Sequence, residues 1–190
     1  MELLVSPWAN TFEIFARSIE SSALIVSPFI TADPLRNLAL WLKSPDSIHI
    51  DILTNLAVDS MIQGSTSPRA LVEFSAAVPL TKVRHLPGLH AKVYVSDRRA
   101  AVITSANLTR GGLRQNYEYG IKITDPALVH QIRDDLVGYG ALGAEVSPLE
   151  LAHLADVTDD LQGRMSSIMG SATIRLRDEF QARATEARES

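Results

Sequence analysis

Residues 89–120 read LHAKVYVSDRRAAVITSANLTRGGLRQNYEYG, and this stretch predicts both a set of strands and a group of reactive side chains. Residues 91–95 and 100–104 are apolar runs separated by the turn sequence SDRR, which predicts a β-hairpin. Residues 117–123 alternate and predict a further strand. We therefore expect several strands in close succession, with polar residues at their ends.

Outside this stretch, apolar β-branched runs alternate with helical patterns. The strand patterns cover residues 23–26, 48–53 and 82–86, and the helical patterns cover residues 11–20, 34–43, 68–77 and 126–138. Four helix starts place a capping side chain before a proline: Asp33-Pro34, Ser67-Pro68, Asp125-Pro126 and Ser147-Pro148. This order predicts an α/β fold with a mixed β-sheet sandwiched by helices.

The pattern changes near residue 145. Residues 148–162 and 166–187 both look helical, with a separation near Gly163. We expect one domain over residues 1–145 and a C-terminal helical segment over residues 146–190. That segment either packs on the domain or offers a surface to a partner.

The composition is that of an ordinary globular protein, with 46% hydrophobic and 21% charged residues in 190. The chain has no cysteine, which excludes disulfides, cysteine-based zinc sites and thiol redox chemistry. No signal-peptide pattern is present, and no apolar stretch approaches the roughly 18 residues that span a bilayer. We therefore expect a soluble, cytoplasmic protein that does not bind membranes.

Positive charge is concentrated in the middle of the chain, although the net charge is −4. Residues 82–122 hold eight Lys or Arg residues and only two acids, Asp97 and Glu118. Such a block is either a chance cluster spread over several faces or a concave basic site for an anionic substrate.

The side chains after residue 89 match the needs of phosphodiester transfer. His90 can act as the nucleophile, and Lys92, two residues away on the same strand face, can supply positive charge. Ser105 and Asn107 can donate hydrogen bonds to the phosphoryl oxygens as negative charge develops on them. Glu118 can accept a hydrogen bond from the far ring nitrogen of His90 and so fix its tautomer.

Each of these residues also has an ordinary structural explanation. Lys92 could be solvated on a strand, Ser105 and Asn107 could cap a loop, and Glu118 could pair with Arg114. Asp97 lies in a turn, where its default role is to stabilise that turn. Arg110 and Arg114 could contact substrate phosphates or be solvated.

The pattern as a whole resembles the phospholipase D superfamily. His90, Lys92 and Asp97 match H-x-K-x(4)-D, Ser105 and Asn107 match S-x-N, and Glu118 follows at the distance seen in small bacterial nucleases. The earlier stretch ALIVSPFIT, residues 23–31, resembles the first strand and loop of such domains. The single motif places the chain with small endonucleases and the catalytic domains of some restriction enzymes.

The resemblance implies that residues 1–145 are a phospholipase D-like catalytic domain. It also implies a two-step reaction through a covalent phosphohistidine on His90, with no metal and no cofactor. Lys92, Ser105, Asn107 and Glu118 would be the other catalytic residues. Asp97 would support the structure more than the chemistry.

A single motif has a consequence for the oligomeric state. In-line displacement puts the nucleophile and the leaving group on opposite sides of phosphorus, so one His90 cannot easily serve both. A two-fold homodimer with the active site on its axis would bring a second His90 to act as general acid and then as base.

We expect a nuclease that hydrolyses DNA and, as an open alternative, RNA. A phospholipase or small-molecule phosphodiesterase is a second hypothesis, which an apolar surface beside the site would favour. A third is a non-catalytic nucleic-acid-binding or dimerisation module. The C-terminal helices could dock a helicase or another part of a restriction system.

Overall fold

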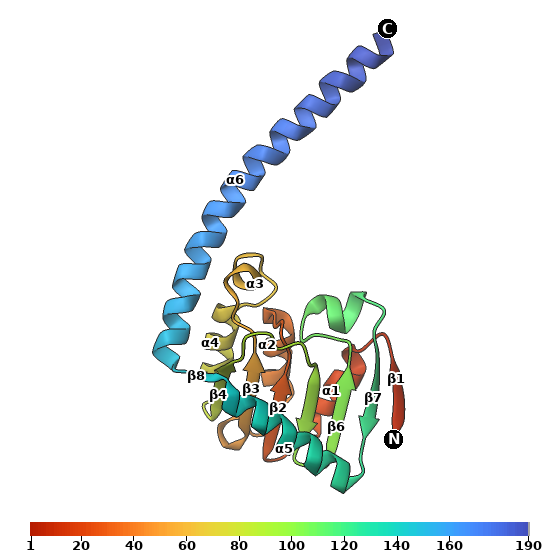
Figure 1. The fold of residues 1–190 in the computed structure, drawn as a ribbon, viewed down its shortest axis with the longest axis vertical. Coiled ribbons are helices and arrows are strands. Elements are labelled where there is room, and N and C mark those ends of the chain that lie inside the picture. The colour runs from red at the N-terminus through yellow and green to blue at the C-terminus, as the bar shows by residue number, and fades with distance from the viewer. Residues whose placement is uncertain (190) are drawn as a thin grey trace.

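The computed structural model describes the backbone of residues 1–189 and the side chains of residues 1–168 and 170. Over these residues, eight strands form one mixed sheet with helices on both faces (Figure 1). This confirms the predicted α/β fold. The strands are β1 (Glu2–Val5), β2 (Ser22–Val26), β3 (His49–Thr54), β4 (Thr81–His85), β5 (Val93–Ser96), β6 (Ala100–Thr104), β7 (Tyr119–Ile123) and β8 (Ala144–Val146).

The sheet order is β1-β7-β6-β5-β2-β3-β4-β8. Strands β2, β3 and β4 are parallel to one another, and every other pairing is antiparallel. The strand patterns of the sequence correspond to β2 to β7, within two residues at each end. The two edge strands, β1 and β8, were not predicted, because they are only four and three residues long.

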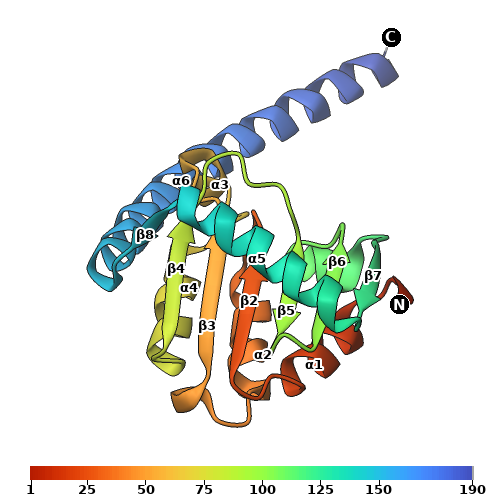
Figure 2. The same ribbon diagram turned by 60° about the horizontal axis from the view of Figure 1, so that its bottom comes forward.

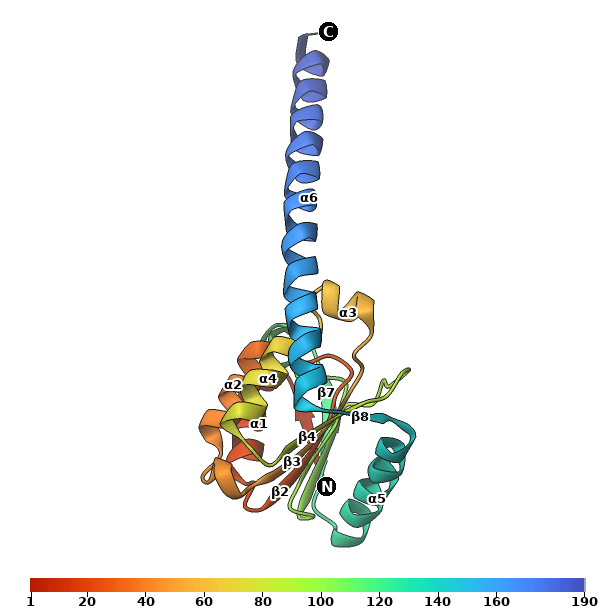
Figure 3. The same cartoon turned by 90° about the vertical axis from the view of Figure 1, so that its left-hand side faces the viewer.

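Helices cover the two faces unequally. Figure 3 shows α1, α2 and α4 on one side of the sheet and α5 alone on the other. Figure 2 shows α5 lying across its face of the sheet. The helices are α1 (Ala9–Arg17), α2 (Ala32–Trp41), α3 (Val58–Ile62), α4 (Pro68–Ala77), α5 (Pro126–Leu142) and α6 (Pro148–Glu189), with a 3₁₀ turn η1 (Pro45–Ser47) and a π-helical turn η2 (Gly111–Gln115).

Three of the four predicted caps form at helix starts. Ser67 Oγ accepts from Ala70 N, and Asp125 Oδ1 accepts from Leu128 N. Ser147 and Glu150 form a reciprocal capping box at the start of α6. The fourth prediction was wrong, because α2 begins at Ala32, one residue before Asp33.

Two hydrophobic cores lie on the two faces of the sheet. The larger, beneath α1, α2 and α4, contains an aromatic cluster in which the rings of Phe12 and Tyr94 lie 5.6 Å apart, edge to face. The smaller lies beneath α5 and joins β2 and β5 to Val129 and Leu136. The sheet is therefore buried on both faces at its centre.

The C-terminal segment is one continuous helix and not the two that the sequence predicted. Gly163 lies within α6 and is exposed, where glycine costs only about 1 kcal/mol relative to alanine. The first turns of α6 pack on α4 and α3. Arg69 binds Asp156 and Asp159 at 2.5 and 2.8 Å, and Gln162 donates to Met61 O at 2.7 Å. Beyond these contacts the helix extends away from the domain (Figure 1).

Substitution of Leu151 tests whether the start of α6 packs on the domain. Its side chain is 2% exposed, whereas Leu149, two residues earlier, is 84% exposed. We expect Leu151→Ala to lower the free energy of unfolding by about 2–4 kcal/mol, because it leaves a cavity between α6 and the domain. Leu149→Ala should change it by less than about 0.5 kcal/mol. Urea denaturation of both variants measures the difference, and equal effects would show that α6 does not dock as described.

Candidate active site

Strand register brings three separate segments to one edge of the sheet. Val93 at the start of β5 pairs with Val26 at the end of β2 and with Ile103 near the end of β6. Thr104 at the end of β6 pairs with Gly120 at the start of β7. The residues just before β5, just after β6 and just before β7 therefore meet. These segments carry all five predicted catalytic residues.

His90 and Lys92 contact each other in the segment that precedes β5. The Lys92 ammonium donates to His90 O at 2.8 Å, and its Nζ lies 3.4 Å from Nδ1 and 3.3 Å from Nε2 of the His90 ring. The strand begins at Val93, later than predicted, yet Thr104 N still donates to Lys92 O at 3.1 Å. The exposed imidazole is thus held beside a fixed positive charge.

Lys92 is unusual because it is almost completely buried. Its exposed fraction is 8%. Burial removes water from the ammonium and lowers the pKa of Lys92, and the nearby negative charge of Glu118 opposes this only in part. A phosphate anion at this place would replace the missing solvation of the cation.

The loop that follows β6 is pinned by buried hydrogen bonds. Ala106 N donates to Thr104 Oγ1 at 2.9 Å, and Tyr94 Oη donates to Ala106 O at 2.9 Å. Leu108 N donates to Ser27 Oγ at 2.9 Å, so the loop is also tied to the end of β2. Sequence reasoning did not identify Ser27 and Tyr94 as supports. The match of residues 23–31 to the first strand and loop of the family was a signal for Ser27.

The side chain of Asn107 has one buried polar atom without a hydrogen-bond partner. Its Oδ1 is buried, and among the described residues it has no hydrogen-bond partner. Its backbone is packed against Gly112, where a Cβ atom would lie 2.4 Å from Asn107 O. Only glycine fits at residue 112, which explains why a glycine follows the asparagine at this distance. The unpaired Oδ1 can only accept hydrogen bonds, so it is Nδ2 of the same amide that could donate to a phosphoryl oxygen.

Glu118 links the start and the end of the segment between β6 and β7 through hydrogen bonds. Its carboxylate accepts hydrogen bonds from Ser105 Oγ and, at 3.0 Å, from Asn116 Nδ2. The ion pair with Arg114 that we considered as an alternative is not formed between these described side chains. A bond between Glu118 and the His90 ring is likewise not formed in the described chain, so that role of Glu118 stays a prediction.

Ser6 is a support of the site that the sequence did not reveal. Glu118 N donates to Ser6 Oγ at 2.5 Å, and Ser6 Oγ in turn donates to Asn116 O at 2.9 Å. Ser6 N also donates to Glu118 O at 3.1 Å. Ser6 lies more than 100 residues from its partners in the sequence, so no local pattern could have identified it.

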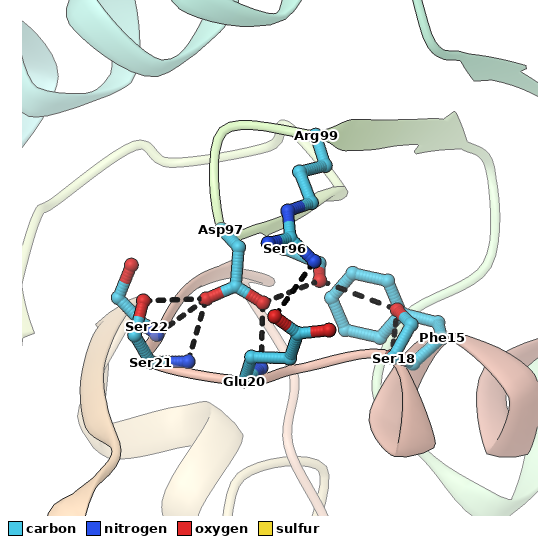
Figure 4. A network of polar contacts seen from close by, with 8 residues as sticks. All are labelled: Phe15, Ser18, Glu20, Ser21, Ser22, Ser96, Asp97 and Arg99. Carbon is cyan, nitrogen blue, oxygen red and sulfur yellow. Dashed lines mark hydrogen bonds and ion pairs between the residues drawn. The ribbon is translucent and has the colours of Figure 1, made fainter.

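Asp97 lies at the opposite end of β5 from His90 and Lys92. Figure 4 shows its carboxylate facing Glu20, Ser21 and Ser22. Its carboxylate accepts from the backbone N–H groups of Glu20, Ser21 and Ser22 at 2.6–2.8 Å. These bonds hold the β5–β6 turn, in which Asp97 and Arg98 have positive φ, against the start of β2. Partial burial raises the pKa of Asp97, but the N–H groups outweigh it, and the pKa lies below its usual value.

The basic block of residues 82–122 does not form one site, which corrects the expectation of a single concave basic surface. Arg98 and Arg99 lie in the turn at the far end of β5, and Arg99 binds Glu20 at 2.7 Å. Arg84 binds Glu145 at 2.8 Å on the sheet edge. Besides Lys92, only Arg110 and Arg114 belong to the segments at the active-site edge, and both are exposed.

The described residues also bear on metal binding and on membrane insertion. Among the described side chains, no three His, Cys, Asp or Glu residues group as ligands of a metal ion. Within the described part of the chain, no helix combines the length and apolar character needed to cross a bilayer.

Comparison with known families identifies the class of protein. The family model described as "Cardiolipin synthase, PLD-like domain" matches residues 16–137, which include His90, Lys92, Ser105, Asn107 and Glu118. The chain therefore belongs to the phospholipase D-like family, as the motif predicted. The comparison with curated proteins yields no match.

Solved structures share the fold at low sequence identity. NucT from Helicobacter pylori is 20% identical with a TM-score of 0.60, covering 75% of this chain and 96% of its own. Nuc, a phospholipase D family member from Salmonella typhimurium, is 18% identical with a TM-score of 0.59, covering 76% and 95%. Phosphatidylserine synthase from Haemophilus influenzae is 15% identical with a TM-score of 0.67, covering 92% of this chain and 46% of that one.

Asp97 can be tested as a structural residue. We expect Asp97→Ala to lower the free energy of unfolding by about 2 kcal/mol, because several N–H groups lose a charged acceptor. Asp46, which is exposed, provides a matched control, and Asp46→Ala should have little effect. Chemical denaturation at neutral pH measures both values, and equal stability of the two variants would contradict the assigned role.

The same carboxylate predicts a pH dependence. Folding lowers the pKa of Asp97, so its stabilisation is complete above the unfolded value of about 4 and is lost as pH falls toward the folded pKa. The stability difference between wild type and Asp97→Asn should therefore shrink as pH is lowered below about 4. A difference that stays constant over this range would show that the charge of Asp97 is not involved.

Proposed function

We propose that this chain is a metal-independent nuclease that hydrolyses DNA, and RNA as a related substrate, through a covalent phosphohistidine on His90. The observation that supports it most directly is the exposed His90 imidazole beside the buried ammonium of Lys92. The nucleophile and the positive charge thus lie together beside residues 105–107, the loop that buried hydrogen bonds hold in place. This arrangement suits a substrate with a negatively charged phosphorus centre.

The first step forms a P–N bond. A His90 ring nitrogen attacks phosphorus, and the bond from phosphorus to the leaving oxygen breaks as that oxygen takes a proton from a general acid. Lys92 stabilises the charge on the non-bridging oxygens, and Asn107 Nδ2 donates to them. The Ser105 hydroxyl donates to them once its proton turns away from Glu118. In the second step water attacks phosphorus, the P–N bond breaks, and the conjugate base of the general acid takes the proton of water.

The described chain has one such histidine, so the general acid must come from elsewhere. We propose a two-fold homodimer in which His90 of a second copy is the acid and then the base. The α5 face of the sheet supports this arrangement, because α5 leaves part of it uncovered.

The uncovered part is an apolar patch on β1, β7 and β6. Register places Leu3 beside Ile121, Val5 beside Tyr119 and Ile121 beside Ile103, so all five point to one face. Leu3, Val5, Ile103 and Tyr119 are exposed. The patch borders the site, since Tyr119 follows Glu118 and Ile103 lies two residues before Ser105. A second copy seated on this patch would also bring the two sites together.

The same patch favours one other function. An apolar surface beside a phosphodiesterase site could instead contact lipid, as a phospholipase would require. The two possibilities predict different oligomeric states in solution, because in a dimer the second copy would cover the patch. Hydrolysis of phosphatidylcholine by a monomeric protein would favour the lipid enzyme over the nuclease.

The central test is cleavage of plasmid and single-stranded DNA in excess EDTA at low salt. We expect the wild type and the control His153→Ala, an exposed histidine on α6, to cleave both substrates. His90→Ala should lose at least about 1,000-fold in rate, since it removes the nucleophile. Loss of wild-type cleavage on adding EDTA would contradict the mechanism. Binding without cleavage would favour a non-catalytic module.

Mixing subunits tests the shared site. Wild type and His90→Ala are combined in varying ratios, unfolded and refolded together, and assayed for cleavage. If each site needs His90 from both copies, mixed dimers are inactive and activity follows the square of the wild-type fraction. A linear dependence would show that each chain acts with its own His90 alone. Molar mass by light scattering confirms that the mixtures are dimeric.

A further inference from the structure

Tyr117 is the most exposed aromatic residue among the described side chains. Its exposed fraction is 101%, compared with 56% for Tyr119 and 49% for Tyr139. An aromatic ring that is fully surrounded by water has no packing role in the described chain. Tyr117 lies between Asn116 and Glu118 in the chain, so its backbone borders the candidate active site.

The backbone on both sides of Tyr117 is fixed. Ser6 Oγ donates to Asn116 O at 2.9 Å and accepts from Glu118 N at 2.5 Å, and Asn116 Nδ2 donates to the Glu118 carboxylate. The ring is therefore presented to solvent from a backbone that is held in place. A ring on a fixed backbone loses less conformational entropy when a ligand stacks on it.

Two arginines accompany the ring on the same loop. Arg110 and Arg114 are exposed, and neither forms an ion pair with another described side chain. In contrast, Arg84 and Arg99, from the same basic block, are paired with Glu145 and Glu20. The loop thus combines an exposed ring with two available cations. Aromatic rings and unpaired cations together are the means by which proteins hold single-stranded nucleic acid.

We propose that Tyr117 is a stacking platform for an unpaired base of the substrate, and that the site therefore prefers single-stranded nucleic acid. This inference rests on the proposed nuclease function and narrows its substrate. Arg110 and Arg114 hold the phosphates of the same strand. In a duplex both faces of each base are already stacked on neighbours, so the ring gains nothing unless the strands separate.

Binding is measured separately from cleavage, on a His90→Ala background that leaves the strand intact. A fluorescently labelled single-stranded oligonucleotide is titrated against three further substitutions: Tyr117→Ala, Tyr117→Phe and, as an exposed tyrosine on α5, Tyr139→Ala. We expect Tyr117→Ala to weaken binding about tenfold, which is the loss of one stacked base. Tyr117→Phe keeps the ring and should bind within about twofold of the background, as should Tyr139→Ala.

Two comparison ligands identify the contact as stacking. The effect of Tyr117→Ala should disappear on a strand with abasic sites and should be small on a duplex of the same sequence. An equal loss on the abasic strand would overturn the proposal. Dissociation of the dimer by Tyr117→Ala, detected by light scattering, would also overturn it, because the ring would then belong to a subunit interface.

The wild-type cleavage assay separates this inference from the proposed function. If wild type cleaves single-stranded DNA and Tyr117→Ala neither weakens binding nor slows cleavage, the inference fails and the nuclease function stands. If wild type cleaves no nucleic acid but Tyr117→Ala weakens binding to the intact strand and not to the abasic one, the stacking site stands without the nuclease. If the chain binds no nucleic acid, both fail.

Discussion

The pairing register of β5, β6 and β7 is the constraint on which the site depends. His90 and Lys92 precede β5, Ser105 and Asn107 follow β6, and Glu118 precedes β7. If either pairing slipped by one residue, every side chain of the shifted strand would turn to the opposite face of the sheet, and these groups would be separated. Asp97 holds the far end of the β5–β6 hairpin against β2 with hydrogen bonds to three successive N–H groups. The family motif therefore contains both the candidate catalytic residues and the residue that secures their register.

The polar groups of the site are held firmly but are not all satisfied. Hydrogen bonds to Ser27 and Thr104, and one from Tyr94, pin the loop after β6. Ser6 pins the segment that carries Glu118. Lys92 is nevertheless buried without an ion pair among the described residues, and Asn107 Oδ1 has no partner. Burying the Lys92 cation without an ion pair costs stability, and a bound phosphate offsets that cost. The site is thus organised before its ligand arrives.

The two faces of the sheet differ in a way that links fold and function. Helices α1, α2 and α4 cover one face, and α5 alone lies across the other (Figures 2 and 3). The uncovered strands present apolar side chains that border the single-histidine site. This exposed apolar surface borders the site at which the proposed reaction would use a second histidine. One second copy of the chain would cover the surface and supply that histidine, which is why we prefer the dimer to a lipid-binding surface.

The sequence by itself determined the fold class, the strands β2 to β7 and the family, because local periodicity and a motif of close spacing carry that information. It also placed the caps of α4, α5 and α6, since a cap depends on residues three positions apart. Only the tertiary structure revealed the edge strands, the continuity of α6 and the support of Glu118 by Ser6. It also showed that Arg84 and Arg99 are paired away from the site, although they are close to His90 in the chain. The edge strand β1 and the Ser6 contacts depend on pairing between β1 and β7, in which Glu2 pairs with Lys122, and local sequence cannot specify which distant groups such pairing brings together.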